Sequence, residues 1–370
     1  MQNPPRVLII GASVRAAAQS ARRAGWDVVA SDMFGDADLR EIAEFVPIDS
    51  YPDGFSRVLQ AYDLPVIYTG GLENYPDLLA EAPTLWGNFA EPLVRARDPF
   101  VWTELFQSSG IRTPGLKRHD DQPAVPEAWL VKSFKGAGGG GVRFATTGQG
   151  DASTFLQEFI PGQLTSGVFV GTPSGAVLCG VTKQLTRATC DEVPFAYGGT
   201  VGPVGLADSC ERQICEVGDL LAASAGLRGL FGVDFILDGT SLVPIEINPR
   251  YTASVEVLEL ASQRSLLAEH KAACCGELVS TVPVVPTRCL AKVILYAASD
   301  MTIGVELNRQ VLPKYARFAD TPLPGTHVPA GRPVCTLLCE GETPGAALDR
   351  AENLVPNAFV SHTWLQGLPE

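Results

Sequence analysis

The sequence predicts an α/β protein that begins with a doubly wound parallel α/β domain and continues as strand-rich α+β structure. Three observations predict this class. Residues 6–33 read as strand, glycine turn, helix and strand, which is the opening of a doubly wound layer. The 370 residues are too many for one ordinary core, so two or three domains are expected. A hydrophobic content of 46% with 19% charged residues is typical of a packed globular protein.

The charge balance narrows the classes of function. The chain has 28 Lys and Arg against 41 Asp and Glu, a net charge of −13. This charge disfavours binding to nucleic acid or to an acidic membrane surface. The sequence has no apolar run long enough to span a bilayer, and its 9 cysteines include no C-x-x-C pair. We therefore expect a cytoplasmic protein with reduced thiols.

Residues 1–95 are expected to form the first domain. The apolar run at 7–10 suits a parallel strand that is buried on both faces. Gly11 is the only glycine of the turn that follows, so the three-glycine fingerprint of dinucleotide-binding domains is absent. Ser13 and Arg15 come just after the strand, where open parallel sheets bind ligands. Arg15 is either a clamp for a substrate carboxylate or an ordinary solvated helix residue.

A glycine-rich hairpin is predicted at residues 128–144, after an amphipathic helix from 97 to 110 with Val101 on its apolar side. Its loop formally contains G-x-G-x-x-G, but a strand-like segment follows where a dinucleotide fingerprint needs a helix. No Gly-Lys-Ser/Thr closes it either, so it is not a Walker loop. The loop amides could fold over phosphates, with Lys132 reaching the same phosphates. The alternative is a simple flexible hairpin.

A second hairpin, at residues 226–250, gathers oxygen ligands. The apolar side chains of its second strand, the odd-numbered residues from 243 to 247, are expected to face the core. The opposite face would then carry Asp234, Glu246 and Asn248. Two carboxylates and an amide oxygen suit Mg²⁺, and Arg250 close by suits the charge of a phosphate. The alternative is a solvated strand face.

Together these segments resemble a known family. The glycine hairpin with its Lys132, the segment Gln-Glu-Phe-Ile-Pro-Gly at 157–162 and the VDF…EINPR hairpin occur in the order typical of the ATP-grasp superfamily, in its carboxylate-amine ligase branch. The resemblance spans nearly the whole chain. It implies a two-part ATP-grasp α+β fold with ATP between two β layers. Its parts would be a glycine-loop subdomain at 96–165 and a metal-site subdomain at 166–370 with a C-terminal β-rich extension.

The resemblance also implies a role for each matching residue. Contacts to the ATP phosphates would come from Lys132, Gly136, Gly138, Gly139 and Gly140. The adenine hinge would be formed by Gln157, Glu158, Phe159 and Ile160. Mg²⁺ or Mn²⁺ would be held by Asp234, Glu246 and Asn248. The catalytic residues would be Arg250 and Lys183. Arg97 stands where family members often carry a first ATP-binding Lys, so either Arg97 replaces that Lys or the contact is missing. Substrate would be bound by Ser13, Arg15, Tyr197, Gly198 and Gly199.

The activity that the resemblance implies is ATP-dependent ligation of a small carboxylic acid or amino acid to an amine. An acyl phosphate would form first, and ADP and phosphate would be released. The alternatives are an ATP-dependent carboxylase or phosphoryl transferase on the same fold, or a catalytically silent ATP-binding sensor. The expected partners are the two small-molecule substrates and a second copy of the chain in a homodimer.

Overall fold

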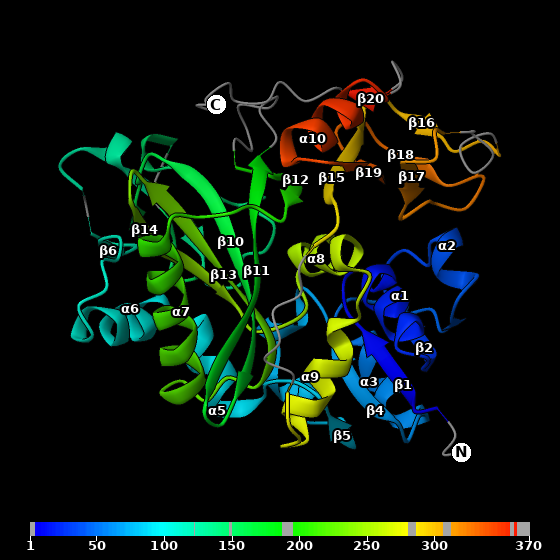
Figure 1. Cartoon of the computed structure of the whole chain (residues 1–370), viewed down its shortest axis with the longest axis horizontal. Coiled ribbons are helices and arrows are strands. Elements are labelled where there is room, and N and C mark those ends of the chain that lie inside the picture. The colour runs from blue at the N-terminus through cyan, green and yellow to red at the C-terminus, as the bar shows by residue number, and fades with distance from the viewer. Residues whose placement is uncertain are drawn as a thin grey trace.

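The computed structural model describes residues 4–121, 123–147, 150–186, 195–279, 286–305, 312–355 and 359–360. Three sheets of five, four and nine strands and one two-stranded ribbon carry the architecture. Figure 1 shows the N-terminal layer in blue beside the large sheet, with α8 (Ala253–Ser262) and α9 (Leu266–Cys274) between them. The parallel first sheet and the antiparallel sheets that follow confirm the predicted α/β and α+β class.

Five parallel strands form the N-terminal sheet in the order β3-β2-β1-β4-β5. They are β1 (Arg6–Ile10), β2 (Asp27–Ser31), β3 (Glu44–Phe45), β4 (Pro65–Tyr68) and β5 (Thr84–Leu85). The connecting helices are α1 (Arg15–Arg23), α2 (Ala37–Arg40), α3 (Gly54–Ala61), η1 (Leu72–Asn74) and α4 (Pro76–Leu79). β1 packs against α1 through one face and against α3 through the other, because its side chains are buried on both sides. The strand order reverses between β1 and β4, so their carboxyl ends form the crevice where such sheets bind ligands.

Two helices lead from this layer to the rest of the chain. α5 (Ala90–Arg97) and α6 (Pro99–Ser108) meet at Asp98, whose carboxylate accepts a hydrogen bond from the backbone N–H of Phe100 at 2.9 Å and so caps α6. The predicted apolar side of this region is wrong at Val101, which is 43% exposed. Trp102 and Phe106 are the residues of α6 that enter the core.

The small sheet is antiparallel, with the strand order β6-β9-β7-β8. Its strands are β6 (Leu116–Arg118), β7 (Trp129–Ser133), β8 (Arg143–Phe144) and β9 (Thr154–Glu158), with the short helices η2 (Pro126–Ala128) and η3 (Ala145–Thr147). β7 and β8 form the predicted hairpin, in which Leu130 pairs with Phe144. The glycine-rich segment is the connection between these two strands.

The large sheet runs in the order β14-β13-β10-β11-β12-β15-β19-β17, and β20 also pairs with β15. Its strands are β10 (Gln163–Thr172), β11 (Gly175–Thr186), β12 (Tyr197–Gly202), β13 (Gly229–Asp238), β14 (Ser241–Asn248), β15 (Cys289–Ala297), β17 (Ala316–Ala319), β19 (Pro333–Gly341) and β20 (Phe359–Val360). The ribbon pairs β16 (Met301–Thr302) with β18 (His327–Val328). The predicted hairpin at 226–250 is therefore the pair β13–β14, with β14 on the edge.

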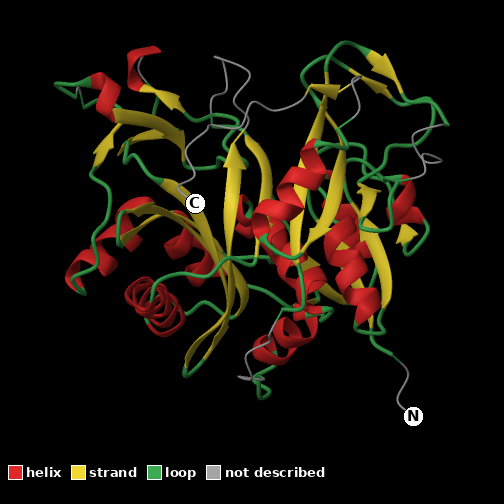
Figure 2. Cartoon of the chain, turned by 45° about the horizontal axis from the view of Figure 1, so that its top comes forward, coloured by secondary structure: helices red, strands yellow, loops and turns green. Residues whose placement is uncertain are grey.

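Helices cover both faces of the large sheet. α7 (Asp208–Ala223) packs on one face through a core that includes Phe169, Ile214 and Phe231. α8 and α9 pack on the other face and contact α1, which joins the large sheet to the N-terminal layer (Figure 2). α10 (Pro344–Glu352) covers β15 and β19. Gln263 follows α8 in a left-handed conformation with φ of 55° and so ends this helix before α9 begins.

In the part of the chain that the structure describes, no helix is both long enough and apolar enough to cross a lipid bilayer.

Candidate active site

The three predicted metal ligands lie together on the β13–β14 pair. Asp234 of β13 pairs directly with Glu246 of β14, and Asn248 donates a hydrogen bond from Nδ2 to Asp234 Oδ2 at 3.1 Å. In the described residues no three Asp, Glu, His or Cys side chains form a metal cluster. The set consists instead of two carboxylates and an amide, which is a donor set that leaves coordination positions to water and phosphate.

A β-bulge changes the predicted alternation along β14. The register shifts between Asp234 and the next residue, and Leu242 and Ile247 both enter the same hydrophobic core although they are an odd number of residues apart. The prediction that all odd-numbered residues from 243 to 247 face this core is therefore wrong. The bulge also exposes the carbonyl of Ile245, which accepts hydrogen bonds from Lys132 Nζ at 3.3 Å and from Gln157 Nε2 at 3.1 Å.

The two carboxylates of the site have opposite pKa shifts. Burial and the charge of Glu246 raise the pKa of Asp234 to about 7. Burial opposes ionisation of Glu246 too, but Lys132, Arg97 and Arg250 outweigh it and lower the pKa of Glu246. Like charges held this close cannot both ionise without a compensating cation. A divalent cation would supply that compensation, so the residues present fit Mg²⁺ or Mn²⁺.

Lys132 joins the two antiparallel sheets. It lies on β7 of the small sheet and contacts Ile245 of β14, while Nζ also donates to Gln157 Oε1 of β9 at 3.1 Å. Burial lowers the pKa of Lys132, and the nearby charges of Glu246 and Asp234 oppose this effect. The ammonium group thus lies beside the predicted metal ligands, where phosphate oxygens would meet it.

Arg97, which was expected either to replace a first ATP-binding Lys or to leave that contact missing, connects three parts of the site. Nη1 lies 3.3 Å from Glu246 Oε1, Nη2 donates to the carbonyl of Gly136 at 2.9 Å, and Nε donates to Asn74 Oδ1 at 3.2 Å. Asn74 in turn donates from Nδ2 to the carbonyl of Lys135 at 3.2 Å. Arg97 therefore holds the base of the glycine loop against β14, which carries Glu246.

The glycine loop packs against the start of β12. The N–H of Tyr197 donates to the carbonyl of Gly138 at 2.9 Å. A Cβ at Gly139 would lie 1.9 Å from the carbonyl oxygen of Phe195, and the φ of Gly139 is 69°, so only glycine fits there. Gly140 has open space around its Cβ position. The loop thus lies against β12 through some glycines and presents others to open space.

The predicted adenine hinge, residues 157–160, consists of the end of β9 and the two residues after it. Its side chains do not contribute equally, since Gln157 is buried and bound to Lys132 whereas Glu158 accepts a bond from the N–H of Gly115 at 2.8 Å. Phe159 packs edge-on against Phe144 with 5.2 Å between ring centroids. In the described part of the chain, the backbone N–H of Ile160 has no hydrogen-bond acceptor, which leaves it available to a base.

Arg250 lies between Asn248 of β14 and the N-terminal layer. Nη2 donates to Asn248 Oδ1 at 3.0 Å, and Nε donates to Glu73 Oε1 at 2.7 Å. The guanidinium carbon would be 3.4 Å from a Cβ at Gly70, so it lies over the carboxyl end of β4. Tyr68 fixes the backbone beside it, because its hydroxyl donates to the carbonyl of Pro249 at 2.8 Å. Sequence reasoning missed Glu73, although its position after a parallel strand could have marked it.

The structure corrects the predicted role of Arg15. Its side chain is 0% exposed and forms ion pairs with Glu256 of α8, with Asp320 at 2.8 Å and with Asp38 at 3.6 Å. It therefore has no donor left for a substrate carboxylate. Ser13 of the same turn is exposed at the carboxyl edge of the sheet.

Lys183 was predicted to face the phosphates beside Asp234, but the neighbouring residue Gln184 lies there instead. Directly paired residues of antiparallel strands share a face, and Lys183 pairs with Thr165, which pairs with the core residue Phe235. Lys183 thus lies on the face opposite to Asp234. Its neighbour Gln184 lies on the correct face and donates from Nε2 to Asp234 Oδ1 at 2.5 Å. Gln184 is a site residue that strand alternation could have identified.

The segment at 197–199 is mostly structural. Tyr197 is hydrogen-bonded through its hydroxyl to Thr200 Oγ1 at 2.6 Å, and burial raises its pKa to about 12. Gly198 and Gly199 are buried in β12, and a Cβ at Gly199 would lie 2.3 Å from the carbonyl oxygen of Lys292 on β15. These glycines are needed for close strand packing, so a substrate could be contacted here only through the backbone.

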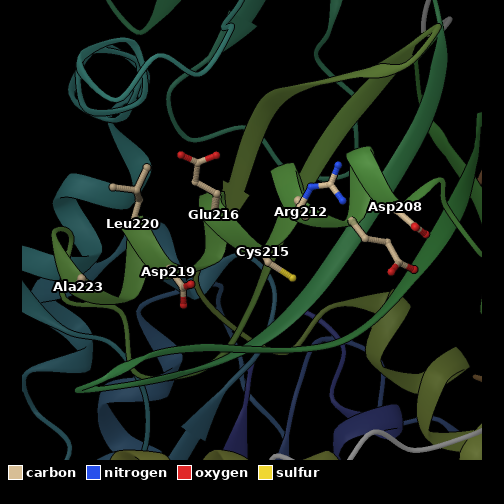
Figure 3. A pocket seen from close by; sticks show the side chains of 8 residues that line it. Asp208, Arg212, Cys215, Glu216, Asp219, Leu220 and Ala223 are labelled. Carbon is tan, nitrogen blue, oxygen red and sulfur yellow. The ribbon is translucent and has the colours of Figure 1, made fainter.

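An open groove of about 760 Å³ lies elsewhere, on the outer side of α7 (Figure 3). Its lining comes from this one helix and carries Asp208, Glu211, Arg212, Cys215, Glu216, Asp219, Leu220 and Ala223. α7 packs on the face of the large sheet opposite to α8. The groove is therefore separate from the site around Asp234.

A comparison with protein families agrees with this geometry. Residues 96–254 match the family model of the ATP-grasp domain. The chain contains an ATP-grasp domain. The matched segment spans the glycine loop, Lys132 and the β13–β14 hairpin with Arg250. Among curated protein sequences, none matches the chain significantly.

Solved structures share the ATP-grasp architecture over nearly the full length. The biotin carboxylase domain of 2-oxoglutarate carboxylase from Hydrogenobacter thermophilus, solved as a dimer with MgADP, ADP and bicarbonate, has a TM-score of 0.75 and 14% identity and covers 98% of this chain and 92% of its own. Phosphoribosylamine–glycine ligase from Thermotoga maritima has a TM-score of 0.71 and 18% identity and covers 97% and 98%. L-amino acid ligase from Bacillus licheniformis has a TM-score of 0.72 and 13% identity and covers 96% and 98%. At these identities the likeness shows the fold, which carries ligases and carboxylases alike.

Proposed function

We propose that the protein is an ATP-dependent carboxylate-amine ligase that acts through an acyl phosphate. The observation that supports this most directly is the position of Arg250. It touches the metal-ligand set through Asn248 and the ligand-binding edge of the N-terminal layer through Glu73. A carboxylate bound at that edge would therefore lie next to the γ-phosphate of a nucleotide held by the β13–β14 hairpin.

Different groups of residues would bind the metal and the phosphates during phosphoryl transfer. Asp234, Glu246 and Asn248 would hold Mg²⁺ or Mn²⁺, which would neutralise phosphate charge and align the transferred group. Lys132 would bind phosphate oxygens from the small sheet. The backbone amides of the glycine loop would enclose the same phosphates. We propose that the parts meeting here are a domain at 1–95, a glycine-loop subdomain at 96–165 and a metal-site subdomain at 166–370.

The proposed reaction has two displacement steps. An oxygen of the substrate carboxylate attacks the γ-phosphorus of ATP, and the bond to ADP breaks. The amine then attacks the acyl carbon, the phosphate leaves with its oxygen, and the amine nitrogen loses a proton. Arg250 would stabilise the negative charge that develops in both steps, because its guanidinium is held beside the carboxylate to be activated. No covalent protein nucleophile is required.

Trapping with hydroxylamine tests the proposal without knowledge of the natural amine. Acyl phosphates react with hydroxylamine to give hydroxamates, so a panel of carboxylic acids with Mg-ATP should yield a hydroxamate and ADP in equal amounts. Arg250→Met should abolish the product. Arg112→Met is the matched control, since Arg112 forms an exposed ion pair with Asp238 at 2.7 Å.

Other outcomes would contradict the ligase proposal in distinct ways. ADP release that depends on bicarbonate would indicate a carboxylase, and a stable phosphorylated product would indicate a phosphoryl transferase. Binding of Mg-ATP without turnover of any acid would indicate a silent nucleotide sensor. The homodimer stays a prediction, which sedimentation velocity would check.

A further inference from the structure

A group of carboxylates, three of them buried and two half-buried, lies at the carboxyl edge of the N-terminal sheet, and the proposed phosphoryl transfer does not use it. We call this group the acidic cluster. Its members come from the β2–α2 connection and α2, from α8 and from the residue after β17, and they are Asp32, Asp36, Asp38, Glu256 and Asp320. The N–H of Ala37 donates to the carbonyl of Thr321 at 2.8 Å, so the first and last of these segments are held together.

Four members of the acidic cluster have structural partners. Asp32 accepts hydrogen bonds from the backbone N–H groups of residues 14, 34 and 35 at 2.8–3.0 Å. Asp38 accepts from the backbone N–H groups of residues 320 and 321 at 3.0 and 3.1 Å. Glu256 binds Arg15 and, at 2.7 Å, Lys292. Asp320 binds Arg15 and the hydroxyl of Thr336, the latter at 2.5 Å. These four carboxylates are therefore occupied.

Asp36 is the exception. Its side chain is only 6% exposed, yet among the described residues its carboxylate accepts no hydrogen bond and pairs with no cation. A carboxylate with so little contact to solvent and no partner in the described protein is costly to ionise, so such groups are rare outside functional sites. The neighbouring charges show where it faces: burial and the charges of Asp320, Asp32 and Asp38 raise the pKa of Asp36 to about 8, while Arg15 opposes them.

The charges around Asp36 do not balance. The acidic cluster has five carboxylates, and the buried cations that meet it are Arg15 and Lys292. Arg317 of β17 lies near Glu256 but is exposed, and with it the carboxylates still outnumber the cations. Since the described residues leave no cation for Asp36, this carboxyl group stays mainly protonated at neutral pH, and a cation bound beside it would allow it to ionise.

The acidic cluster is part of the same ligand-binding edge as Arg250. Arg250 lies over the carboxyl end of β4, and Asp32 begins the connection after β2, with β1 between them. Two strand spacings separate β4 from β2, which is about 10 Å. Exposed Ser13 lies between them at the end of β1, and Met33 and Phe34 are 53% and 57% exposed beside Asp32. A small linear molecule could span this edge.

We propose that Asp36, within the acidic cluster, binds a primary ammonium group of a substrate whose carboxylate lies at Arg250. The substrate class is an amino acid that carries its amino group at the far end of a short chain. The inference rests on the proposed function, since it assigns the second end of a substrate at that same site. An ammonium group would provide the cation that the acidic cluster lacks, and its N–H groups would donate to Asp36.

Calorimetric binding to the full chain with Mg-ADP present tests this proposal separately from catalysis. The ligands are the ω-amino acids from 3-aminopropanoate to 8-aminooctanoate, each compared with the unsubstituted acid of the same length. At least one ω-amino acid should bind about tenfold more tightly than its unsubstituted acid, which is the effect of one charge-assisted hydrogen bond. Asp36→Asn should remove this preference while Mg-ADP binding stays unchanged.

Asp53→Asn is the matched control. Asp53 also precedes a helix without capping it through its side chain, but it is exposed. This variant should keep the wild-type preference. A second measurement uses buffers of different ionisation enthalpy: ammonium binding at neutral pH should release a proton in the wild type and not in Asp36→Asn, because the bound cation favours the ionised carboxylate.

Two results would overturn the assignment. One is the absence of any ammonium-dependent preference across the whole series in a protein that binds Mg-ADP. The other is a preference that survives in folded Asp36→Asn. Neither result depends on turnover, so failure of the ligase proposal is seen separately, as a lack of hydroxamate.

Discussion

Replacing Arg15 with Met should destabilise the protein strongly. The guanidinium is fully buried and donates to Asp320 Oδ1 and Oδ2 at 2.8 and 2.9 Å, to Glu256 and to Gln19 Oε1 at 3.2 Å. Met fills a similar volume but leaves the two carboxylates with one cation, Lys292, which binds Glu256. Breaking a buried ion pair from one side costs about 3–5 kcal/mol. We expect the free energy of unfolding to fall by that amount.

Urea unfolding followed by tryptophan fluorescence measures this change. Trp26 and Trp86 are buried reporters in the N-terminal layer, with 5.6 Å between their ring centroids. Arg22→Met on the same helix is the control, because its ion pair with Asp27 at 2.8 Å is exposed and should contribute about 0–1 kcal/mol. Equal losses for the two variants, or a loss below about 1 kcal/mol for Arg15→Met, would refute the reasoning.

Three further predictions concern the loop, the arginine and the buried histidine. Gly139→Ala should weaken Mg-ATP binding about tenfold or more, because its Cβ would lie 1.9 Å from a backbone oxygen. Gly140→Ala is the control and should leave the affinity unchanged, since the space around Gly140 is open. Calorimetry measures the Mg-ATP affinity of both variants. Glu73→Gln should slow hydroxamate formation by about 10–100-fold through loss of the charge-assisted bond to Arg250, with Mg-ATP affinity unchanged. An unchanged rate would show that Glu73 does not position Arg250. Burial lowers the pKa of His270 from 6.5 to about 4. The neutral imidazole therefore contributes about 3 kcal/mol to the free energy of unfolding above pH 6.5, and this contribution is lost as the pH falls towards 4. His270→Gln should flatten this pH dependence of urea unfolding, and an unchanged slope would assign it to other groups.

Local patterns predicted much of the fold and part of the site. The strand at 6–10, the glycine hairpin and the β13–β14 pair were predictable because each is encoded by neighbouring residues. Asp234 and Glu246 were placed together correctly because directly paired residues need only a hairpin turn between them. Such features depend on short-range periodicity, which a single sequence contains.

The errors at Arg15 and Lys183 involve contacts between distant segments, whereas the error in β14 comes from a bulge within one hairpin. The bulge in β14 reverses the alternation after Ile245, and no local pattern marks it. Arg15 was expected either to clamp a substrate carboxylate or to be solvated, but its partners are Asp320 and Glu256, more than two hundred residues away. Lys183 was assigned through the family resemblance, whereas its face is set by pairing with two other strands. Tertiary packing decides these positions, so composition and spacing could not.

The short helix η1 (Leu72–Asn74) touches both Arg97 and Arg250, which contact residues of the proposed metal-binding strand β14. Glu73 binds Arg250, while Asn74 binds Arg97 and the carbonyl of Lys135 at the base of the glycine loop. A ligand on the N-terminal edge that shifts η1 would change the nucleotide site at the same time. Occupancy of the two sites is then thermodynamically linked, and the linkage is reciprocal. Nucleotide should raise or lower the affinity for the acid by the same factor that the acid raises or lowers the affinity for nucleotide.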